Sequence, residues 1–153
     1  MRSFDLRSLR FDDKDEAWRR LPVDVDPFVL GGTEYAVRDG VVELDLEAAR
    51  VGDRITLSGS FETVLQGPCE RCLEPAEVPF ELSATEVVRH GESEGYDEDD
   101  DEKYVRRHNL EADRWIRDLI AAEMPSQILC REECRGLCPI CGANLNEQPN
   151  HRH

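Results

Sequence analysis

The sequence predicts an α+β protein, with a small antiparallel β-sheet, one main C-terminal helix and an appended Cys-rich module. Apolar and polar residues alternate repeatedly between residues 34 and 88, as in strands with one buried face. A stripe of apolar residues at helical spacing follows between residues 109 and 124. Four of the six cysteines then fall between Cys130 and Cys141, and two more form an upstream C-x-x-C pair. Such clusters are typical of a zinc-binding module.

The length of 153 residues fits one domain, 1–153, with the module at 130–153 packed with Cys69 and Cys72. We find no apolar run of the roughly 18 residues that a membrane span requires, and the N-terminus lacks the apolar core of a signal peptide. We therefore expect a cytoplasmic protein with no membrane partner. Its thiols should stay reduced, which favours metal over disulfides.

The chain is strongly acidic, with 34 Asp and Glu against 19 Lys and Arg and a net charge of −15. Such a chain is repelled by nucleic-acid phosphates at long range and attracted to basic partners. Eight carboxylates fall between Glu92 and Glu102. We expect residues 91–103 to form an acidic flexible loop, or alternatively a docking site for a basic partner.

The N-terminal part, residues 2–30, predicts strand pieces interrupted by loops. Trp18 is expected on a short helix or, more simply, packed in the core or at an edge. Asp39-Gly40 lies between two apolar runs, which predicts a type I′ hairpin turn. After a turn at Gly52, residues 53–66 read as a half-buried antiparallel strand.

Gly67-Pro68 turns the chain, and the strand pattern resumes at residue 76. The first cysteine pair should therefore cap a hairpin, with Pro79 marking its second arm as an edge strand or a bulge. A helix is expected over 109–124, capped by Asn109 and ended by Pro125.

The strongest local motif is Cys138-Pro139-Ile140-Cys141-Gly142. In such a knuckle the glycine can adopt a positive φ, so that backbone N–H groups point at the first sulfur and stabilise its thiolate. Cys69-Glu70-Arg71-Cys72 is a looser version, with Leu73 in the glycine position.

Six cysteines and the two histidines near residue 153 supply eight ligands, enough for two closed tetrahedral zinc sites. The first favoured set is Cys69, Cys72, Cys130 and Cys134. The second favoured set is Cys138, Cys141, His151 and His153. Two alternatives remain open: one site that joins the upstream pair to the knuckle, and a frayed histidine tail that binds nothing.

These ligands are of structural type, because a catalytic zinc keeps an open position for water. The sequence contains no H-E-x-x-H motif, Walker loop, G-x-G-x-x-G or G-x-S-x-G, and we expect no small-molecule substrate. A thiol oxidoreductase would need its C-x-x-C in a βαβ setting. Three arginines beside the cysteines either offset the charge of the thiolates or contact RNA phosphate or a partner. They are Arg71, Arg131 and Arg135. If these arginines contact RNA phosphate or a partner, we expect further arginines of the helix and its approach to join them, namely Arg106, Arg107, Arg114 and Arg117.

Between Gly40 and Asn146 the chain resembles the bacterial YceD-like family, the large ribosomal RNA subunit accumulation proteins. The resemblance rests on C-x-R-C-L-E-P at 69–75 and on C-x-x-x-C-x-G-L-C-P-x-C-G-x-N-L-N at 130–146. It implies a single YceD-like domain, a role in accumulation or processing of large-subunit (23S) ribosomal RNA, and a functional association with a small basic protein of that subunit. It implies no catalytic residues.

Relatives with this string often end in C-x-C, where this chain has His151-Arg152-His153. Other relatives lack the knuckle half and keep the upstream pair, which supports pairing Cys69 and Cys72 with Cys130 and Cys134. The first functional hypothesis is thus a non-enzymatic ribosome-assembly factor stabilised by one or two structural zinc ions, which binds a basic large-subunit ribosomal protein or the 23S rRNA precursor. The alternatives are an rRNA-processing enzyme and a redox or zinc-responsive regulator.

Overall fold

A computed structural model describes residues 1–89 and 103–153. The expected acidic loop lies outside the described residues, apart from Lys103. The main sheet contains β2 (Glu16–Asp24), β3 (Phe28–Leu30), β4 (Thr33–Val37), β5 (Val41–Val51), β6 (Arg54–Pro68) and β7 (Pro75–Arg89). All of its strand pairs are antiparallel. The predicted mainly antiparallel sheet with one helix is therefore confirmed.

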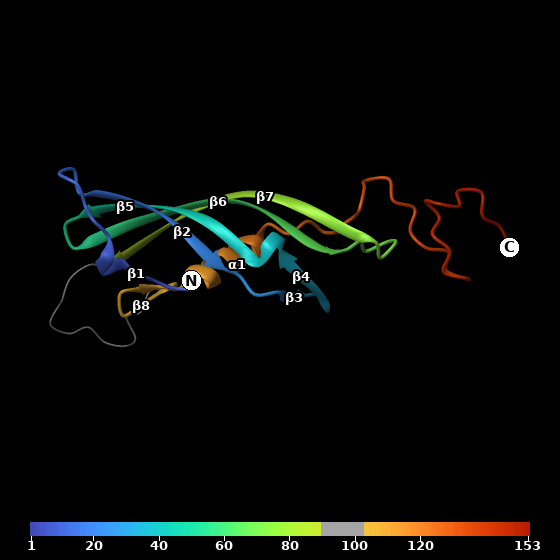
Figure 1. Cartoon of the computed structure of the whole chain (residues 1–153), viewed down its shortest axis with the longest axis horizontal. Helices are drawn as coiled ribbons and strands as arrows, with labels where there is room; N and C mark the ends of the chain where they lie inside the picture. Colours follow the sequence, from blue (N-terminus) through green and yellow to red (C-terminus); the bar gives the residue numbers. More distant parts are fainter. Residues whose placement is uncertain (90–102) are drawn as a thin grey trace.

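The long strand β6 organises this sheet (Figure 1). Its whole length pairs with β7, from Arg54 opposite Arg89 to Pro68 opposite Pro75. Its other edge pairs first with β5 and then with β4. Alternation along β6 buries the residues that the sequence indicated, Ile55, Leu57, Phe61 and Leu65. Among the described strands β7 pairs only with β6, so Pro79 lies in an edge strand, as expected.

The prediction of a β-hairpin at Asp39-Gly40 is wrong. Both residues have positive φ, 62° and 70°, as a type I′ turn requires. However, β4 and β5 do not fold back on each other, because β6 is long enough to pair with both in succession along one edge. A type I′-like turn does occur at Gly31-Gly32, with φ of 58° and 83°, between the paired strands β3 and β4. A single-turn 3-10 segment, η2 (Arg38–Gly40), makes the junction from β4 to β5.

Of the positions expected for Trp18, only the one at an edge is found. It lies in β2, which pairs only with β5 among the described strands, rather than on a helix, and it is 58% exposed rather than packed in the core.

A second, smaller sheet contains β1 (Phe4–Asp5), β8 (Val105–Arg106) and β9 (Asn109–Leu110), and η1 (Leu6–Ser8) follows β1. The one α-helix of the described residues, α1 (Ala112–Ala122), begins three residues later than predicted. Asn109 is not its cap, because this residue pairs with Asp5 in the small sheet. The N-cap is Glu111, whose side chain makes no capping hydrogen bond.

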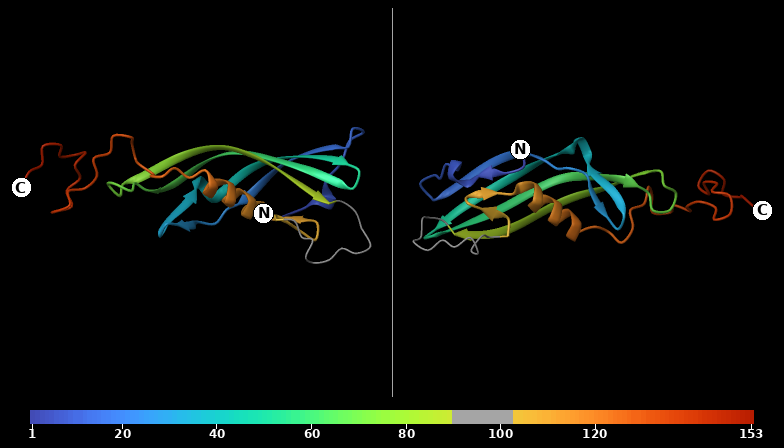
Figure 2. Two further views of the ribbon diagram at one scale, coloured as in Figure 1. Left: turned by 180° about the vertical axis from the view of Figure 1, so that it is seen from behind. Right: turned by 90° about the horizontal axis from the view of Figure 1, so that it is seen from below.

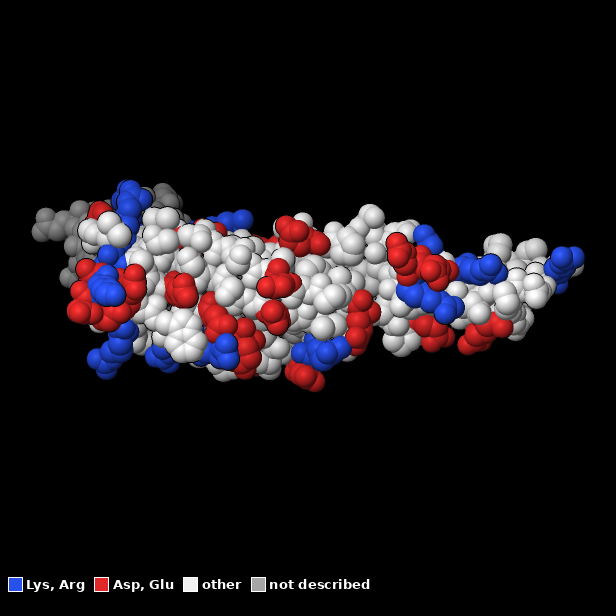
Figure 3. Space-filling model, turned by 90° about the horizontal axis from the view of Figure 1, so that it is seen from above, with Lys and Arg blue, Asp and Glu red and all other residues white. Residues whose placement is uncertain are grey.

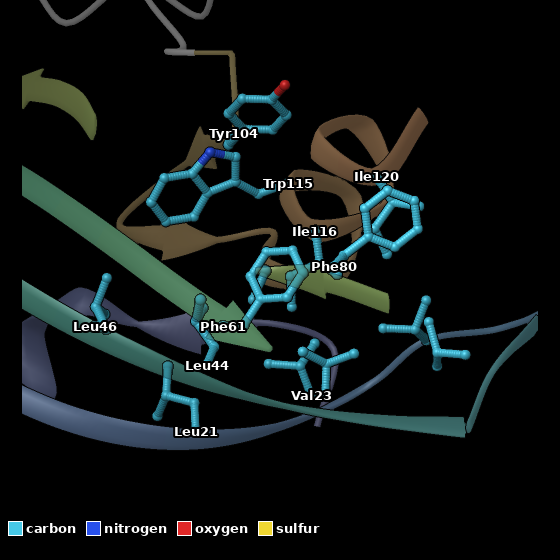
Figure 4. Close-up of a cluster of buried hydrophobic side chains, with 14 of the residues drawn as sticks. Leu21, Val23, Leu44, Leu46, Phe61, Phe80, Tyr104, Trp115, Ile116 and Ile120 are labelled. Atoms are coloured by element: carbon cyan, nitrogen blue, oxygen red, sulfur yellow. The ribbon is translucent and has the colours of Figure 1, made fainter. Parts of the chain in front are cut away.

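The core lies between the inner face of the main sheet and α1 (Figures 1, 2 and 4). Trp115 and Ile116 of the helix are 1% and 0% exposed, and Trp115 lies directly over Gly59 of β6. A Cβ atom at position 59 would lie 2.8 Å from the indole ring, so the close approach depends on the glycine. Strand residues such as Leu21, Leu44 and Phe61 line the same cluster.

Beyond α1 the chain runs to the end of the sheet where β6 meets β7, and residues 125–153 project past it (Figures 1 and 2). This segment contains no helix or strand, only an isolated bridge between Leu137 and Asn144. Ile128 is its buried anchor at 1% exposure.

Candidate metal centres

The β6–β7 hairpin carries the first cysteine pair at its tip, as predicted. The last strand pair joins Pro68 and Pro75, and the residues between them form the turn. Within it the N–H of Leu73 donates to the carbonyl of Cys69 at 2.9 Å, and the N–H of Cys69 donates to the carbonyl of Glu74 at 2.7 Å. Leu73 adopts a φ of 66°, a conformation that normally favours glycine.

The knuckle at Cys138 repeats this pattern. The N–H of Gly142 donates to the carbonyl of Cys138 at 2.9 Å, and the N–H of Cys138 donates to the carbonyl of Ala143 at 2.8 Å. Gly142 has a φ of 76°, so the expected positive φ is confirmed. Two segments 69 residues apart in the chain thus have the same turn, and only the second has the favoured glycine.

Backbone and side-chain contacts hold the C-terminal segment against the hairpin tip. The N–H of Glu70 donates to the carbonyl of Ile128 at 2.8 Å. The guanidinium of Arg71 donates to the carbonyl of Cys134 at 3.0 Å and to Oε1 of Gln127 at 3.2 Å. Gly136, with a φ of 78°, packs so closely that a Cβ there would lie 3.1 Å from the carbonyl of Arg71. The second cysteine pair is brought to the first by these contacts.

The structure brings the first four sulfurs, those of Cys69, Cys72, Cys130 and Cys134, within 4.8 Å of one another. The Sγ atoms of Cys69 and Cys134 are 3.7 Å apart, and those of Cys72 and Cys130 are 3.5 Å apart. Cys69, Cys72 and Cys134 are 0%, 4% and 2% exposed. We call these four residues the hairpin cluster.

A second group, Cys138, Cys141, His151 and His153, also has its ligand atoms within 4.8 Å of one another. Cys138 Sγ lies 3.2 Å from His153 Nε2, and Cys141 Sγ lies 3.2 Å from His151 Nε2. The two Nε2 atoms are 3.0 Å apart. We call this group the terminal cluster. The eight residues are grouped as the favoured pairing proposed, and the upstream pair is not joined to the knuckle.

Within the hairpin cluster the thiols differ in acidity. Burial raises the pKa of Cys69, but N–H groups of Cys72, Cys130 and Arg71 outweigh it and lower the pKa to about 6. Burial and the neighbouring thiols raise the pKa of Cys130 to about 12. The pKa of Cys134 is also lowered, whereas that of Cys72 is raised. Two sulfurs of the cluster therefore ionise more readily than a free thiol, and the other two ionise only when a cation balances their charge. In the terminal cluster the N–H groups of Cys141 and Ile140, followed by His153, lower the pKa of Cys138 to about 6.

Asn146 contacts the hairpin cluster, and sequence reasoning did not single it out as a site residue. Its Nδ2 donates to Cys134 Sγ at 3.3 Å, and its Oδ1 accepts from the N–H of Arg135 at 3.0 Å. The amide contact is the main cause of the lowered pKa of Cys134. Asn146 lies between Cys141 and His151 in the chain, so it links the segment of the terminal cluster to a sulfur of the hairpin cluster. The sequence did contain a signal for this residue, because Asn146 is the last residue of the N-L-N that ends the family's C-terminal string.

The three arginines have different surroundings. Arg71 is engaged with backbone of the C-terminal segment, as described, and Arg135 donates to the carbonyl of Pro149 at 3.4 Å. Arg131 is exposed, and its side chain makes no hydrogen bond or ion pair with the described residues. Arg114 of α1 pairs with the Glu111 carboxylate rather than standing free.

Together, the fold and the clusters define a class: a small antiparallel sheet protein with two separate groups of four Cys or His ligands that could each hold a metal ion. Sequence comparison then gives the family. The profile described as "Large ribosomal RNA subunit accumulation protein YceD" matches residues 57–153, and the chain belongs to this family. No solved structure matches.

Several relatives are similar over most of the chain. An uncharacterised protein of Mycobacterium tuberculosis is 32% identical over 131 residues, which cover 83% of this chain and 63% of that protein. A maize protein named "Large ribosomal RNA subunit accumulation protein YCED homolog 1, chloroplastic" is 31% identical over 69% of this chain and 46% of its own length. This chain thus spans less than two thirds of the length of these relatives. In the described residues, no helix has the length and apolar character to cross a membrane.

Proposed function

We propose that this protein is a non-enzymatic, zinc-stabilised factor in ribosome biogenesis. It supports accumulation or processing of 23S ribosomal RNA by binding a basic large-subunit ribosomal protein or the rRNA itself. The observation that carries the proposal is the pair of four-ligand clusters in a chain whose family is named for accumulation of the large ribosomal RNA subunit. We place its action in the cytoplasm, where bacterial ribosomes assemble.

Ligand type and spacing support zinc as the metal. Sulfurs about 2.3 Å from a tetrahedral ion lie about 3.8 Å apart, close to the 3.7 and 3.5 Å in the hairpin cluster. Imidazole nitrogens at about 2.0 Å lie about 3.3 Å apart, against 3.0 Å between His151 and His153. Four thiolates, or two thiolates with two imidazoles, are the usual ligand sets of structural zinc.

Four protein ligands at each ion support a structural rather than a catalytic role. An rRNA-processing enzyme of the metal-dependent type would need a coordination position free for water, and each cluster already fills a tetrahedron. The hairpin setting of Cys69 and Cys72 likewise disfavours dithiol redox catalysis. A redox-responsive regulator would instead lose zinc reversibly on mild oxidation.

The test is complementation in a bacterium that lacks its own member of the family. We expect the wild-type chain to restore the ratio of mature 23S to 16S rRNA, and the double variant Cys138→Ser with Cys141→Ser to restore it poorly. Purified variants whose metal content falls while rRNA is restored in full would contradict the proposed role of zinc. Failure of the wild-type chain would contradict the proposed function.

Capture of partners from the same cells separates the two modes of binding. A basic ribosomal protein retained after nuclease treatment supports direct protein binding. Loss of all ribosomal material after nuclease, with binding that weakens steeply as salt rises, supports rRNA as the direct partner.

A further inference from the structure

The face of the main sheet opposite α1 is open, and Figure 3 looks onto it. Residues that point away from the core along β2, β5, β6 and β7 have no layer above them in the described structure. Trp18 lies on this face and is 58% exposed, which is an unusual position for the largest apolar side chain. We call this surface the open face.

Shallow hollows run across the open face and share their walls. One of about 500 Å³ is lined by Trp18, Glu47 and Ser58 among others. Glu47 and Ser58 also line the next hollow, which continues through Ser60 and Ser83 into one of about 690 Å³. These hollows adjoin one another along the face, and hydroxyl side chains such as Ser58, Ser60 and Ser83 line the places where they meet. We call this row of hollows the groove.

Carboxylates that form no ion pair with the described residues line the far part of this groove, although the charge of Glu43 does act on Arg20 in the same hollow. Glu62 of β6 lies directly opposite Glu81 of β7, and Glu43 of β5 lines the same hollow. Like charges opposite each other on one sheet face destabilise the sheet. Among the described residues none of the three has an ion-pair partner, and the nearby Arg20 is already paired with Asp45 at 2.8 Å.

Figure 3 shows this distribution, with acidic side chains along the middle of the face and most basic ones toward its edge or the C-terminal end. Cations of another molecule that entered this hollow would lie beside Glu43, Glu62 and Glu81 and would offset their like charges. Trp18 at one end offers an aromatic surface on which a guanidinium or ammonium group can stack.

We propose that the open face is the docking surface for a Lys- and Arg-rich segment of a partner protein. Charge complementarity favours protein over RNA, because phosphates would be repelled by these carboxylates and by the net charge of −15. The inference rests on the proposed function and deepens it, since it assigns the basic partner to a surface distinct from both metal clusters.

The test uses the full chain and a peptide of ten lysines as the probe. Trp18 reports binding at the face, because the other tryptophan of the chain, Trp115, is buried. The variant replaces Glu43, Glu62 and Glu81 by Gln. The control variant removes the same charge from exposed carboxylates off the sheet, with Gln at Glu123, Glu132 and Glu147.

We expect the peptide to change the emission of Trp18, and the groove variant to bind it about tenfold more weakly at low salt. The control should bind within about twofold of wild type. Loss of repulsion should also raise the melting temperature of the groove variant. Equal weakening of both variants, an unchanged Trp18 emission at saturation, or a Trp18 response to single-stranded RNA that matches the response to the peptide would each overturn the proposal.

The same variants separate this inference from the proposed function. If the groove variant restores 23S rRNA as well as wild type does, the open face is not the docking surface, although the function stands. If the wild-type chain itself restores nothing, the function fails, whatever the peptide binds.

Discussion

Replacement of Asn146 by Ala tests whether this residue strengthens metal binding at the hairpin cluster. The change removes the N–H that donates to Cys134 Sγ at 3.3 Å and the carbonyl that accepts from Arg135. A hydrogen bond to a charged acceptor contributes about 1.5–3 kcal/mol, and water can replace part of it because Asn146 is only partly buried. We therefore expect a loss of about 1.4 kcal/mol, or tenfold in metal affinity, at the hairpin cluster.

Cobalt titration in competition with a chelator measures this affinity. A site with four thiolates and one with two thiolates and two imidazoles absorb differently, so each cluster is followed separately. The control is Gln148→Ala, an exposed side chain in the same segment. Unchanged affinity at the hairpin cluster, or equal weakening at both clusters, would refute the proposed role of Asn146.

Three further predictions concern stability and metal removal. Gly59→Ala places a methyl group against Trp115 and should lower the free energy of unfolding by about 1–3 kcal/mol, measured by urea denaturation; a loss no larger than that of Ser60→Ala would be inconsistent with this packing. Leu73→Gly relieves the positive φ of an exposed side chain and should stabilise the metal-bound hairpin tip by about 1 kcal/mol in thermal melts, whereas destabilisation would contradict the strain. Chelation should remove amide protection from residues 125–153 in hydrogen exchange while the sheet stays protected, and global unfolding on chelation would show that the sheet core is not independent.

The sequence predicted those parts of the structure that depend on local chemistry. The alternation of apolar and polar residues predicted the strand β6. The turn residues on either side of the first cysteine pair predicted that Cys69 and Cys72 lie at a hairpin tip. Positive φ at Gly142 followed from the same local reasoning.

What could not be predicted depended on partners distant in the chain. Asp39-Gly40 has the dihedral angles of a hairpin turn, yet the length of β6 decides that the flanking strands pair with it instead. Asn109 resembled a helix cap, but pairing with Asp5 placed it in a strand. Trp18 is apolar enough for the core, and only the register of β2 puts it on the open face. The contact of Asn146 with Cys134 likewise arises from tertiary packing.

Metal content by native mass spectrometry is the most direct test of the central claim that two closed clusters stabilise the protein. The intact chain is compared with a truncation that ends at Asn150 and so lacks His151 and His153. We expect two zinc ions in the intact chain and one tightly held ion in the truncation. A single ion that the truncation leaves unchanged, or an intact chain with free thiols and no metal, would contradict the account.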